Sequence, residues 1–317
     1  MKILITGIHG FVGSNLVASL KGEHIIYGLD IQTPQKDGVQ KTNTWEDLQK
    51  GALPEVDAII HLAGKAHDTK NQSKAEVYFE VNTGLTQKIF DYFLQSGARK
   101  FIFFSSVKAA ADTVPGAVLT ENIVPDPKGP YGESKIAAEK YIQSRLAERS
   151  FTDKEVYIFR PCMIHGPGNK GNLNLLYGVV RKGIPWPLGA FENKRTFVSI
   201  DNLCFIIAGF LSKPIPTGVY HIADDEAIST NELIQIICGA MGKKARIWHI
   251  HKGFMEGVAK VGTALHLPLN TERLAKLTEN YVVSNEKLKN ALGIEKLPVS
   301  ARDGLFKTIH SFQKTEL

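Results

Sequence analysis

The first half of the chain alternates short apolar runs with stretches of helical periodicity. The apolar runs, which predict strands, cover residues 2–6, 25–31, 58–63, 101–104 and 156–159. Apolar residues recur at helical spacing over residues 11–20, 81–95 and 131–147. The predicted strands are apolar almost throughout, which is typical of parallel strands buried on both faces and joined by crossover helices. The pattern predicts an α/β fold with a Rossmann-type, doubly wound parallel sheet.

The pattern of predicted elements changes after about Pro161. Turns rich in glycine and proline follow, and the helical stretches become shorter. We therefore expect two domains, residues 1–165 and a smaller C-terminal α/β lobe of residues 166–317. Residues 197–212 are a candidate for a return to the first domain.

Composition limits the class of partner. The 317 residues contain 38 Lys and Arg against 32 Asp and Glu, a net charge of +6. We interpret this as a mild excess spread over the chain, which suits an anionic ligand and not a nucleic acid. The three cysteines, Cys162, Cys204 and Cys238, form no CxxC pair, so we predict no metal site and a cytoplasmic location. No apolar run approaches the ~20 residues of a membrane span, and no membrane partner is expected.

A glycine-rich loop joins the first predicted strand to the first predicted helix. Its spacing, from Thr6 to Gly13, is G-x-x-G-x-x-G. Such glycines allow a tight turn and a close approach to a pyrophosphate, which the helix N-terminus then binds. The candidate cofactor-binding residues here are Gly7, His9, Gly10, Phe11, Val12 and Gly13.

An acidic residue, Asp30, follows the second predicted strand. At that position a carboxylate can accept from the adenosine ribose hydroxyls and repels a 2′-phosphate. No arginine follows it closely, so NAD is favoured as the cofactor. His9 leaves NADP open as the alternative, because a basic residue there can contact an extra phosphate.

Tyr131 and Lys135 lie four residues apart, so on a helix they share one face. A nearby ammonium favours the phenolate, and we expect Lys135 to lower the pKa of Tyr131 and make it a general acid/base. Ser105 and Ser106 follow the strand at 101–104, at the edge where α/β sheets bind ligands. One of these hydroxyls can carry a substrate proton towards Tyr131, while the other can cap the strand end.

In this order, the motifs resemble those of the extended short-chain dehydrogenase/reductase superfamily, in its NAD-dependent nucleotide-sugar epimerase/dehydratase family. The resemblance covers nearly the whole chain and rests on the segments 6–13, 61–63, 105–106, 130–135, 160–168 and 195–201. It implies that Ser106, Tyr131 and Lys135 are catalytic and that Lys135 also holds the nicotinamide ribose. It also implies an NAD-binding first domain, a nucleotide-sugar-binding lobe, and a homodimer formed through the helices at 81–95 and 131–147.

The resemblance adds further site residues. The added cofactor-binding residues are Ala63, Gly64, Lys65, Asn82, Ser105 and Pro161, beside Tyr131 and Lys135. The implied substrate-binding residues are Ser106, Lys108, Tyr131, Asn172 and Arg195, with Asn174 a competitor of Asn172 and Arg195 pairing with the diphosphate. His165 is expected to be a structural histidine.

The chain also departs from the family pattern. Dehydratases of this superfamily carry Asp-Glu directly after the catalytic hydroxyl residue, where this chain has Val107 and Lys108. Dehydration is therefore disfavoured. The expected activity is 4-epimerisation of a UDP-hexose or UDP-N-acetylhexosamine by transient C4 oxidation, in bacterial surface-polysaccharide synthesis. The alternative is an NAD(P)H-dependent reductase of a UDP-4-keto-6-deoxy-N-acetylhexosamine. A non-catalytic cofactor sensor is disfavoured because the Ser, Tyr and Lys are all present.

Overall fold

A seven-stranded parallel sheet forms the larger part of the molecule. The computed structural model describes residues 1–66, 74–148, 153–169, 171–267 and 269–314. The strands lie in the order β3-β2-β1-β4-β5-β6-β9. Their bounds are β1 Lys2–Thr6, β2 Ile25–Leu29, β3 Lys41–Asn43, β4 Ala58–His61, β5 Lys100–Phe104, β6 Glu155–Pro161 and β9 Gly218–Ile222. All neighbours pair in parallel, which confirms the predicted doubly wound sheet.

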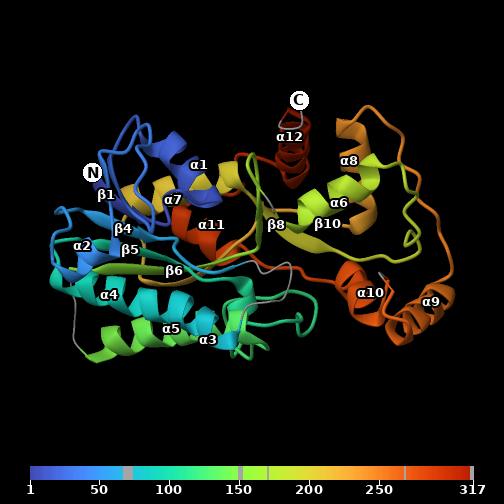
Figure 1. Cartoon of the computed structure of the whole chain (residues 1–317), viewed down its shortest axis with the longest axis horizontal. Coiled ribbons are helices and arrows are strands. Elements are labelled where there is room, and N and C mark those ends of the chain that lie inside the picture. The colour runs from blue at the N-terminus through green and yellow to red at the C-terminus, as the bar shows by residue number, and fades with distance from the viewer. Residues whose placement is uncertain (67–73, 149–152, 170, 268, 315–317) are drawn as a thin grey trace.

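Helices cover both faces of this sheet (Figure 1). One face carries α1 (Phe11–Leu20), α7 (Ile200–Ser212) and α11 (Glu286–Leu292), and the other carries α2 (Trp45–Gln49), α4 (Leu85–Gln95) and α5 (Pro130–Glu148). Successive residues of a strand enter different cores: Ile3 and Ile5 of β1 pack on the α1 side, and Leu4 packs on the α4 side. Burial on both faces explains the continuous apolar runs of the sequence.

The helix predicted at residues 81–95 is longer and irregular. It begins with α3 (Ala75–Tyr78), continues through one π-helical segment, η1 (Phe79–Gly84), and then becomes α4. A π-helical turn inserts an extra residue and often occurs at functional sites. Here it carries Asn82, which is fully buried.

The C-terminal part has its own sheet and core. The three-stranded sheet has the order β10-β8-β7, formed by β7 (Met163–His165), β8 (Arg195–Ser199) and β10 (Ala227–Ile228). The helices of this part are α6 Asn172–Arg181, α8 Thr230–Ala240, α9 Lys252–Ala264, α10 Thr271–Thr278 and α12 Ala301–Lys314. Phe197, Ile237 and Leu305 belong to a hydrophobic core separate from the two that flank the large sheet.

The segment predicted to return to the first domain is divided between the two sheets. Residues 197–199 lie in β8 of the small sheet, whereas α7 packs against α1 and contributes Ile206 and Phe210 to the core of the large sheet. The chain then adds β9 beside β6. The large unit therefore takes up residues from far beyond position 165.

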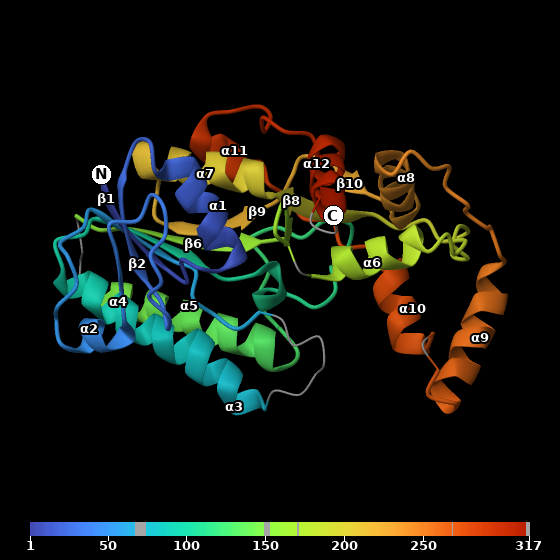
Figure 2. The ribbon, with the colours of Figure 1, turned by 45° about the horizontal axis from the view of Figure 1, so that its top comes forward.

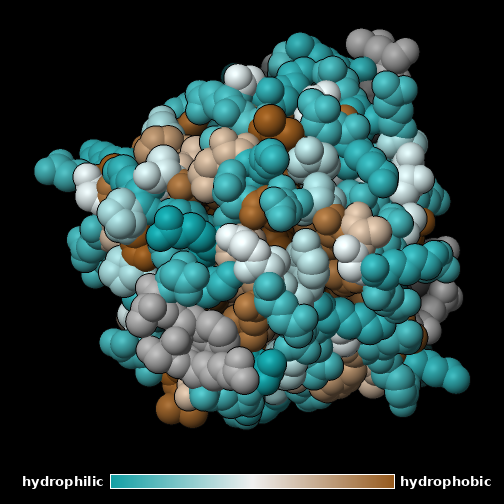
Figure 3. Space-filling model, turned by 90° about the vertical axis from the view of Figure 1, so that its left-hand side faces the viewer, coloured by the Kyte–Doolittle hydropathy of each residue, from teal (hydrophilic) through white to brown (hydrophobic). Residues whose placement is uncertain are grey.

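The surface at the end of the molecule that carries α2 and α4 is largely hydrophilic. Hydrophobic residues form small separate groups on this face (Figure 3). Among the described residues, no helix has both the length and the apolar character that crossing a membrane requires.

Candidate functional site

The glycine-rich loop closes tightly over the carboxyl ends of β1 and β4. Gly7 has a φ of +68°, and a Cβ on Gly13 would lie 2.6 Å from the Gly7 carbonyl oxygen. Gly10 precedes the first residue of α1 and offers no side chain to cap the first-turn N–H groups. These N–H groups and the positive end of the helix dipole suit a phosphate. The loop therefore fits the pyrophosphate of a dinucleotide.

Asp30 lies directly beside this loop. Its Oδ2 accepts from the His9 N–H at 3.0 Å and its Oδ1 accepts from the Ile31 N–H at 2.8 Å. Both bonds orient the carboxylate and leave lone pairs for ribose hydroxyls. The His9 Nε2 is buried without a hydrogen-bond partner among the described residues.

The sequence reasoning missed Lys36. Its Nζ donates to the Ser14 hydroxyl at 2.8 Å, on the first helix after the loop. Burial lowers the pKa of Lys36, and the nearby Asp30 carboxylate opposes this shift. Lys36 lies six residues after Asp30, and a lysine can pair with a phosphate as an arginine does, so the lack of an arginine after Asp30 does not exclude a cation at this site.

A buried hydrogen-bond network holds the end of β4 against the loop. The Thr6 hydroxyl pairs with His61 Nδ1 at 2.7 Å and also accepts from the Ala63 N–H at 3.0 Å. His61 Nε2 lies 3.0 Å from the Thr86 hydroxyl. Burial lowers the pKa of His61 to about 3, so the imidazole stays neutral at physiological pH. The network fixes the backbone of residues 61–63 at the predicted cofactor site.

Asn82 positions the next residues of that segment. Its Oδ1 accepts from the Lys65 N–H at 2.7 Å, and its Nδ2 donates to the Lys65 carbonyl and to the Ser134 hydroxyl. A Cβ on Gly64 would lie 2.9 Å from Asn82 Oδ1 and 3.0 Å from Lys135 Nζ. The predicted residues Gly64, Lys65, Asn82 and Lys135 are thus brought together, with Asn82 acting on the backbone.

Ser106, Tyr131 and Lys135 meet at the carboxyl end of β5. The Ser106 hydroxyl, which caps the short 3₁₀ helix η2 (Val107–Ala109), hydrogen-bonds the Tyr131 phenol. Lys135 lies one turn further along α5, and its Nζ donates to the Phe104 carbonyl at 2.8 Å. A hydroxyl, a phenol and an ammonium are thus gathered at one edge of the sheet, an arrangement suited to proton transfer.

The pKa values differ from the prediction. Burial raises the pKa of Tyr131, and the hydrogen bond from Ser106 partly opposes this shift. Burial also lowers the pKa of Lys135 to about 8, an effect that Glu139 opposes. The Tyr131 pKa is therefore raised in this structure and not lowered as expected, because desolvation by burial outweighs the hydrogen bond with Ser106.

Ser105 turns away from the predicted cofactor site. Its hydroxyl donates to the buried Glu139 carboxylate, which also pairs with Arg160 of β6. The side chain therefore joins helix α5 to the sheet, and the prediction that it binds cofactor gains no support from this contact. Pro161, the last residue of β6, is buried beside β9.

Lys108 and Arg195 approach each other from the two lobes. Lys108 Nζ lies 4.5 Å from the centre of the Tyr281 ring, and burial lowers its pKa while Glu279 opposes the shift. Arg195 donates to the Lys276 carbonyl at 2.9 Å and pairs with Glu279 at 3.1 Å. The predicted diphosphate-binding arginine is thus already engaged by α10 and the residue after it. Glu279 and Tyr281 were missed, because no motif marks them.

The two asparagine candidates differ in environment. Asn172, the first residue of α6, is exposed. The Asn174 Oδ1 is instead buried with no hydrogen-bond partner among the described residues, which favours Asn174 as the ligand-facing amide. His165 is fully buried, pairs with the Thr308 hydroxyl at 2.9 Å and lies 3.7 Å from Asp224, as expected of a structural histidine. The described residues hold no cluster of potential metal ligands.

Comparisons with known proteins agree with this geometry. Residues 3–223 match the model of the NAD-dependent epimerase/dehydratase family. The chain is 34% identical to a UDP-glucose 4-epimerase of Vibrio cholerae over 254 residues, which are 76% of each chain. It is 26% identical to an N-acetyl-α-D-glucosaminyl-diphospho-ditrans,octacis-undecaprenol 4-epimerase of Escherichia coli O157:H7, over 78% of this chain and 75% of the relative.

Solved structures show the same fold. A UDP-glucose 4-epimerase of Thermotoga maritima, solved with UDP-glucose, superposes with a TM-score of 0.76 at 21% identity over the whole of both chains. Together with the family match, the loop, the acid and the Ser-Tyr-Lys group identify the class of the protein. The chain belongs to the NAD-dependent epimerase/dehydratase family and is an enzyme of the extended short-chain dehydrogenase/reductase type.

Proposed function

We propose that this enzyme is an NAD-dependent 4-epimerase of a nucleotide sugar, either a UDP-hexose or a UDP-N-acetylhexosamine. The observation that carries the proposal is the hydrogen bond between Ser106 and Tyr131, with Lys135 one helical turn away. The 4-epimerase relatives in V. cholerae and E. coli O157:H7 support it. We assign the product to bacterial surface-polysaccharide synthesis.

The chain's own groups account for the proton steps. As the phenolate, Tyr131 would accept the C4 hydroxyl proton of the sugar through Ser106, and the resulting phenol would later return a proton to the C4 oxygen of the epimer. Because its pKa is raised, Tyr131 is a proton donor at neutral pH in this state, and bound cationic cofactor would favour the phenolate. Bound NAD would supply the hydride-transfer chemistry that this reaction needs at C4. Val107 and Lys108 offer no carboxylates for an elimination.

We propose that the two parts of the chain bind different ligands. Residues 1–165 supply the cofactor-binding loop and the Ser-Tyr-Lys group, and the 166–317 lobe supplies Arg195 and Asn174 for the nucleotide sugar. We further propose a cytoplasmic homodimer through α4 and α5. These helices lie side by side on one face of the sheet, and the free, buried cysteines suit a reducing compartment (Figure 2).

A 4-keto-sugar reductase is the second candidate. The observation that favours it is Lys36 near Asp30, because a cation near the ribose site helps to hold an exchanging NADPH. The two candidates differ in whether the cofactor stays bound. An epimerase retains it, whereas a reductase releases it after each turnover.

The test measures the bound nucleotide and then activity. The purified protein is denatured, and the released nucleotide is identified by mass spectrometry. Near one NAD per chain, with interconversion of UDP-GlcNAc and UDP-GalNAc or of UDP-glucose and UDP-galactose, is the expected result. No conversion of either pair contradicts the proposal, and NAD(P)H consumption with a UDP-4-keto-6-deoxy-N-acetylhexosamine establishes the reductase.

A matched pair of variants then tests the site. Tyr131→Phe should lower kcat by about 10²–10⁴-fold, the usual contribution of a general acid/base. Tyr141→Phe, on the same helix, removes a hydroxyl that bonds to Asp91 away from the site and should leave kcat unchanged. Equal turnover by the two variants would contradict the role of Tyr131.

A further inference from the structure

The positive charge of the chain is concentrated in one segment. Residues 243–276 contain seven Lys or Arg and two Glu, a net charge of +5 of the +6 carried by the whole chain. The cationic residues are Lys243, Lys244, Arg246, Lys252, Lys260, Arg273 and Lys276. The earlier interpretation of an excess spread over the chain is therefore wrong. Such a concentration makes this segment the natural contact for an anionic surface.

Helix α9, in the middle of this segment, exposes an apolar stripe. The stripe consists of Phe254, Val258 and Val261 of α9 and of Leu265, which directly follows the helix; these residues are 64%, 39%, 55% and 63% exposed. Their spacing of four, three and four residues places them in line along one side of the helix. Four exposed large apolar residues in one line are not the scattered single residues of an ordinary surface.

The stripe is not the face that packs on the protein. Met255, Ala259 and Gly262 form the buried face of α9, at about 90–100° around the helix from the stripe by the helical rotation of ~100° per residue. A Cβ on Gly262 would lie 1.8 Å from the Leu269 carbonyl oxygen, so this face is in close contact with the chain that enters α10. The lobe thus holds α9 by the face of Met255, Ala259 and Gly262 and leaves the apolar stripe largely exposed.

The position of α9 makes the stripe accessible. Both views place α9 at the end of the molecule remote from α2 and α4 (Figures 1 and 2). Trp248, which precedes the helix, is 56% exposed. Tryptophan is enriched where proteins meet the interface of a bilayer.

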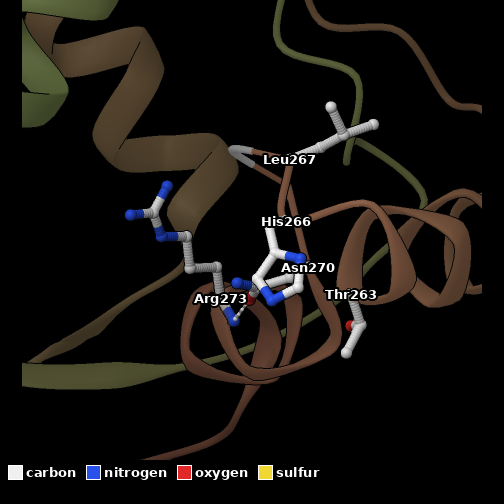
Figure 4. A pocket seen from close by; sticks show the side chains of 5 residues that line it. All are labelled: Thr263, His266, Leu267, Asn270 and Arg273. Atoms are coloured by element: carbon white, nitrogen blue, oxygen red, sulfur yellow. Dashed lines mark hydrogen bonds between the residues drawn. The ribbon is translucent and has the colours of Figure 1, made fainter.

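A hollow opens at the turn from α9 to α10. It has a volume of about 500 Å³ and is lined by Thr263, His266, Leu267, Asn270 and Arg273. Figure 4 shows His266 beside Asn270, with the Arg273 and Leu267 side chains extending to opposite sides. A basic side chain, Arg273, and an apolar side chain, Leu267, therefore flank the hollow, and a lipid offers an anionic headgroup and acyl chains to such a pair.

We propose that α9 binds the surface of a membrane that contains anionic phospholipids. The apolar stripe enters the boundary between headgroups and acyl chains, and the cationic residues of 243–276 contact the lipid phosphates. The helix lies on the bilayer and does not cross it, in agreement with the absence of a spanning helix among the described residues. This proposal departs from the expectation of no membrane partner.

Charge and chemistry favour a membrane over a protein partner. A protein surface needs matched contacts, whereas this segment combines a uniform apolar line, an exposed tryptophan and a net charge of +5 within one surface element. The same helix pair borders the candidate substrate site, because Arg195 donates to the carbonyl of Lys276 in α10. Membrane contact would therefore place that site close to the bilayer.

The experiment uses vesicles of phosphatidylglycerol and phosphatidylcholine, compared with phosphatidylcholine alone. The full chain should cosediment with the anionic vesicles, and the tryptophan fluorescence, to which the exposed Trp248 contributes, should shift to the blue on binding. Phe254→Asp together with Val261→Asp should weaken binding at least about tenfold, because two buried apolar side chains are replaced by charges. Turnover of a soluble substrate should not change, because neither residue contacts the site.

The matched control replaces an exposed Phe and an exposed Val elsewhere. Phe306 and Val124 are 48% and 83% exposed, and their double Asp variant should bind vesicles as the unaltered chain does. Three results would overturn the proposal. The first is that the unaltered chain binds no vesicles, and the second is that the two double variants lose vesicle binding equally. The third is that the unaltered chain binds no vesicles and the Phe254→Asp, Val261→Asp variant dissociates a dimer, which would assign the stripe to a protein interface. Binding that survives the stripe variant shows attraction by charge alone and also overturns it.

Discussion

Glu139 links the stability of the fold to the candidate catalytic helix. It lies on α5 with its side chain fully buried, and its carboxylate accepts hydrogen bonds from Arg160 Nε at 3.0 Å and from Arg160 Nη2 at 2.6 Å. The Ser105 hydroxyl donates to the same carboxylate. Replacing Glu139 by Gln keeps the shape but removes the negative charge, and the Arg160 guanidinium, which is 4% exposed, is left without a counter-ion.

The magnitude follows from this burial. Removing one partner of a buried ion pair lowers the free energy of unfolding by about 3–5 kcal/mol, because the remaining charge stays buried without a counter-ion. For a chain of this length, that loss corresponds to a decrease in Tm of about 5–8 °C. Glu139 also raises the pKa of Lys135, so the variant should lower that pKa further below about 8.

The assay is thermal and denaturant unfolding at pH 7 with no added nucleotide. The control is Glu148→Gln on the same helix, because Glu148 also pairs with an arginine, Arg145, but its side chain is 55% exposed. Exposed pairs contribute about 0–1 kcal/mol, so the control should unfold close to the unaltered chain. Equal effects of the two variants, or a loss below about 1 kcal/mol for Glu139→Gln, would refute the reasoning from burial.

Three further outcomes are expected. Gly13→Ala should abolish tight cofactor binding or lower the free energy of unfolding by about 1–3 kcal/mol, because the added Cβ would lie 2.6 Å from the Gly7 carbonyl oxygen. The control is Gly22→Ala, because a Cβ on Gly22 meets no atom within 4 Å. Equal retention of NAD by the two variants would contradict the argument. The pKa of Lys135 is about 8 in the folded chain, below its value in the unfolded chain, so the unfolded chain binds more protons between pH 8 and 10. Relative to the Lys135→Met variant, the free energy of unfolding of the unaltered chain should therefore rise with pH over this range, by up to about 3 kcal/mol. Parallel stability curves of these two proteins would contradict that sign. Asp30→Asn should weaken NAD binding about 10- to 100-fold, measured by calorimetry, and should lower the ratio of NAD affinity to NADP affinity. An unchanged ratio of the two affinities would show that Asp30 does not bind the ribose.

The sequence predicted the parts of the site that depend on local pattern. The loop from Gly7 to Gly13, the acid Asp30 after β2, and the pair Tyr131 and Lys135 on one helical face lie where the spacing placed them. Each of these signals involves neighbours in sequence, whose geometry a strand, a turn or a helix fixes by itself. The doubly wound class of the sheet followed from the alternation of predicted strands and helices along the chain.

The contacts between distant segments could not be predicted in this way. Ser105 and Ser106 are adjacent in sequence, yet one serves the buried pair of Glu139 and the other serves Tyr131. Which hydroxyl faces which partner depends on the alternation of a strand against the packed helix, not on the motif. The exposed stripe of α9 was also missed, because only the fold shows which apolar residues of an amphipathic helix are left uncovered.

By itself, the sequence determined the doubly wound sheet, the cofactor loop and the pair of Tyr131 and Lys135 on one helical face, since these follow from periodicity and short spacing. Only the tertiary structure decided that Arg195 is engaged by Glu279, that Lys36 approaches Asp30, and that the pKa of Tyr131 rises. The physical reason is that charge pairing and desolvation depend on which segments, far apart in the chain, exclude water from one another.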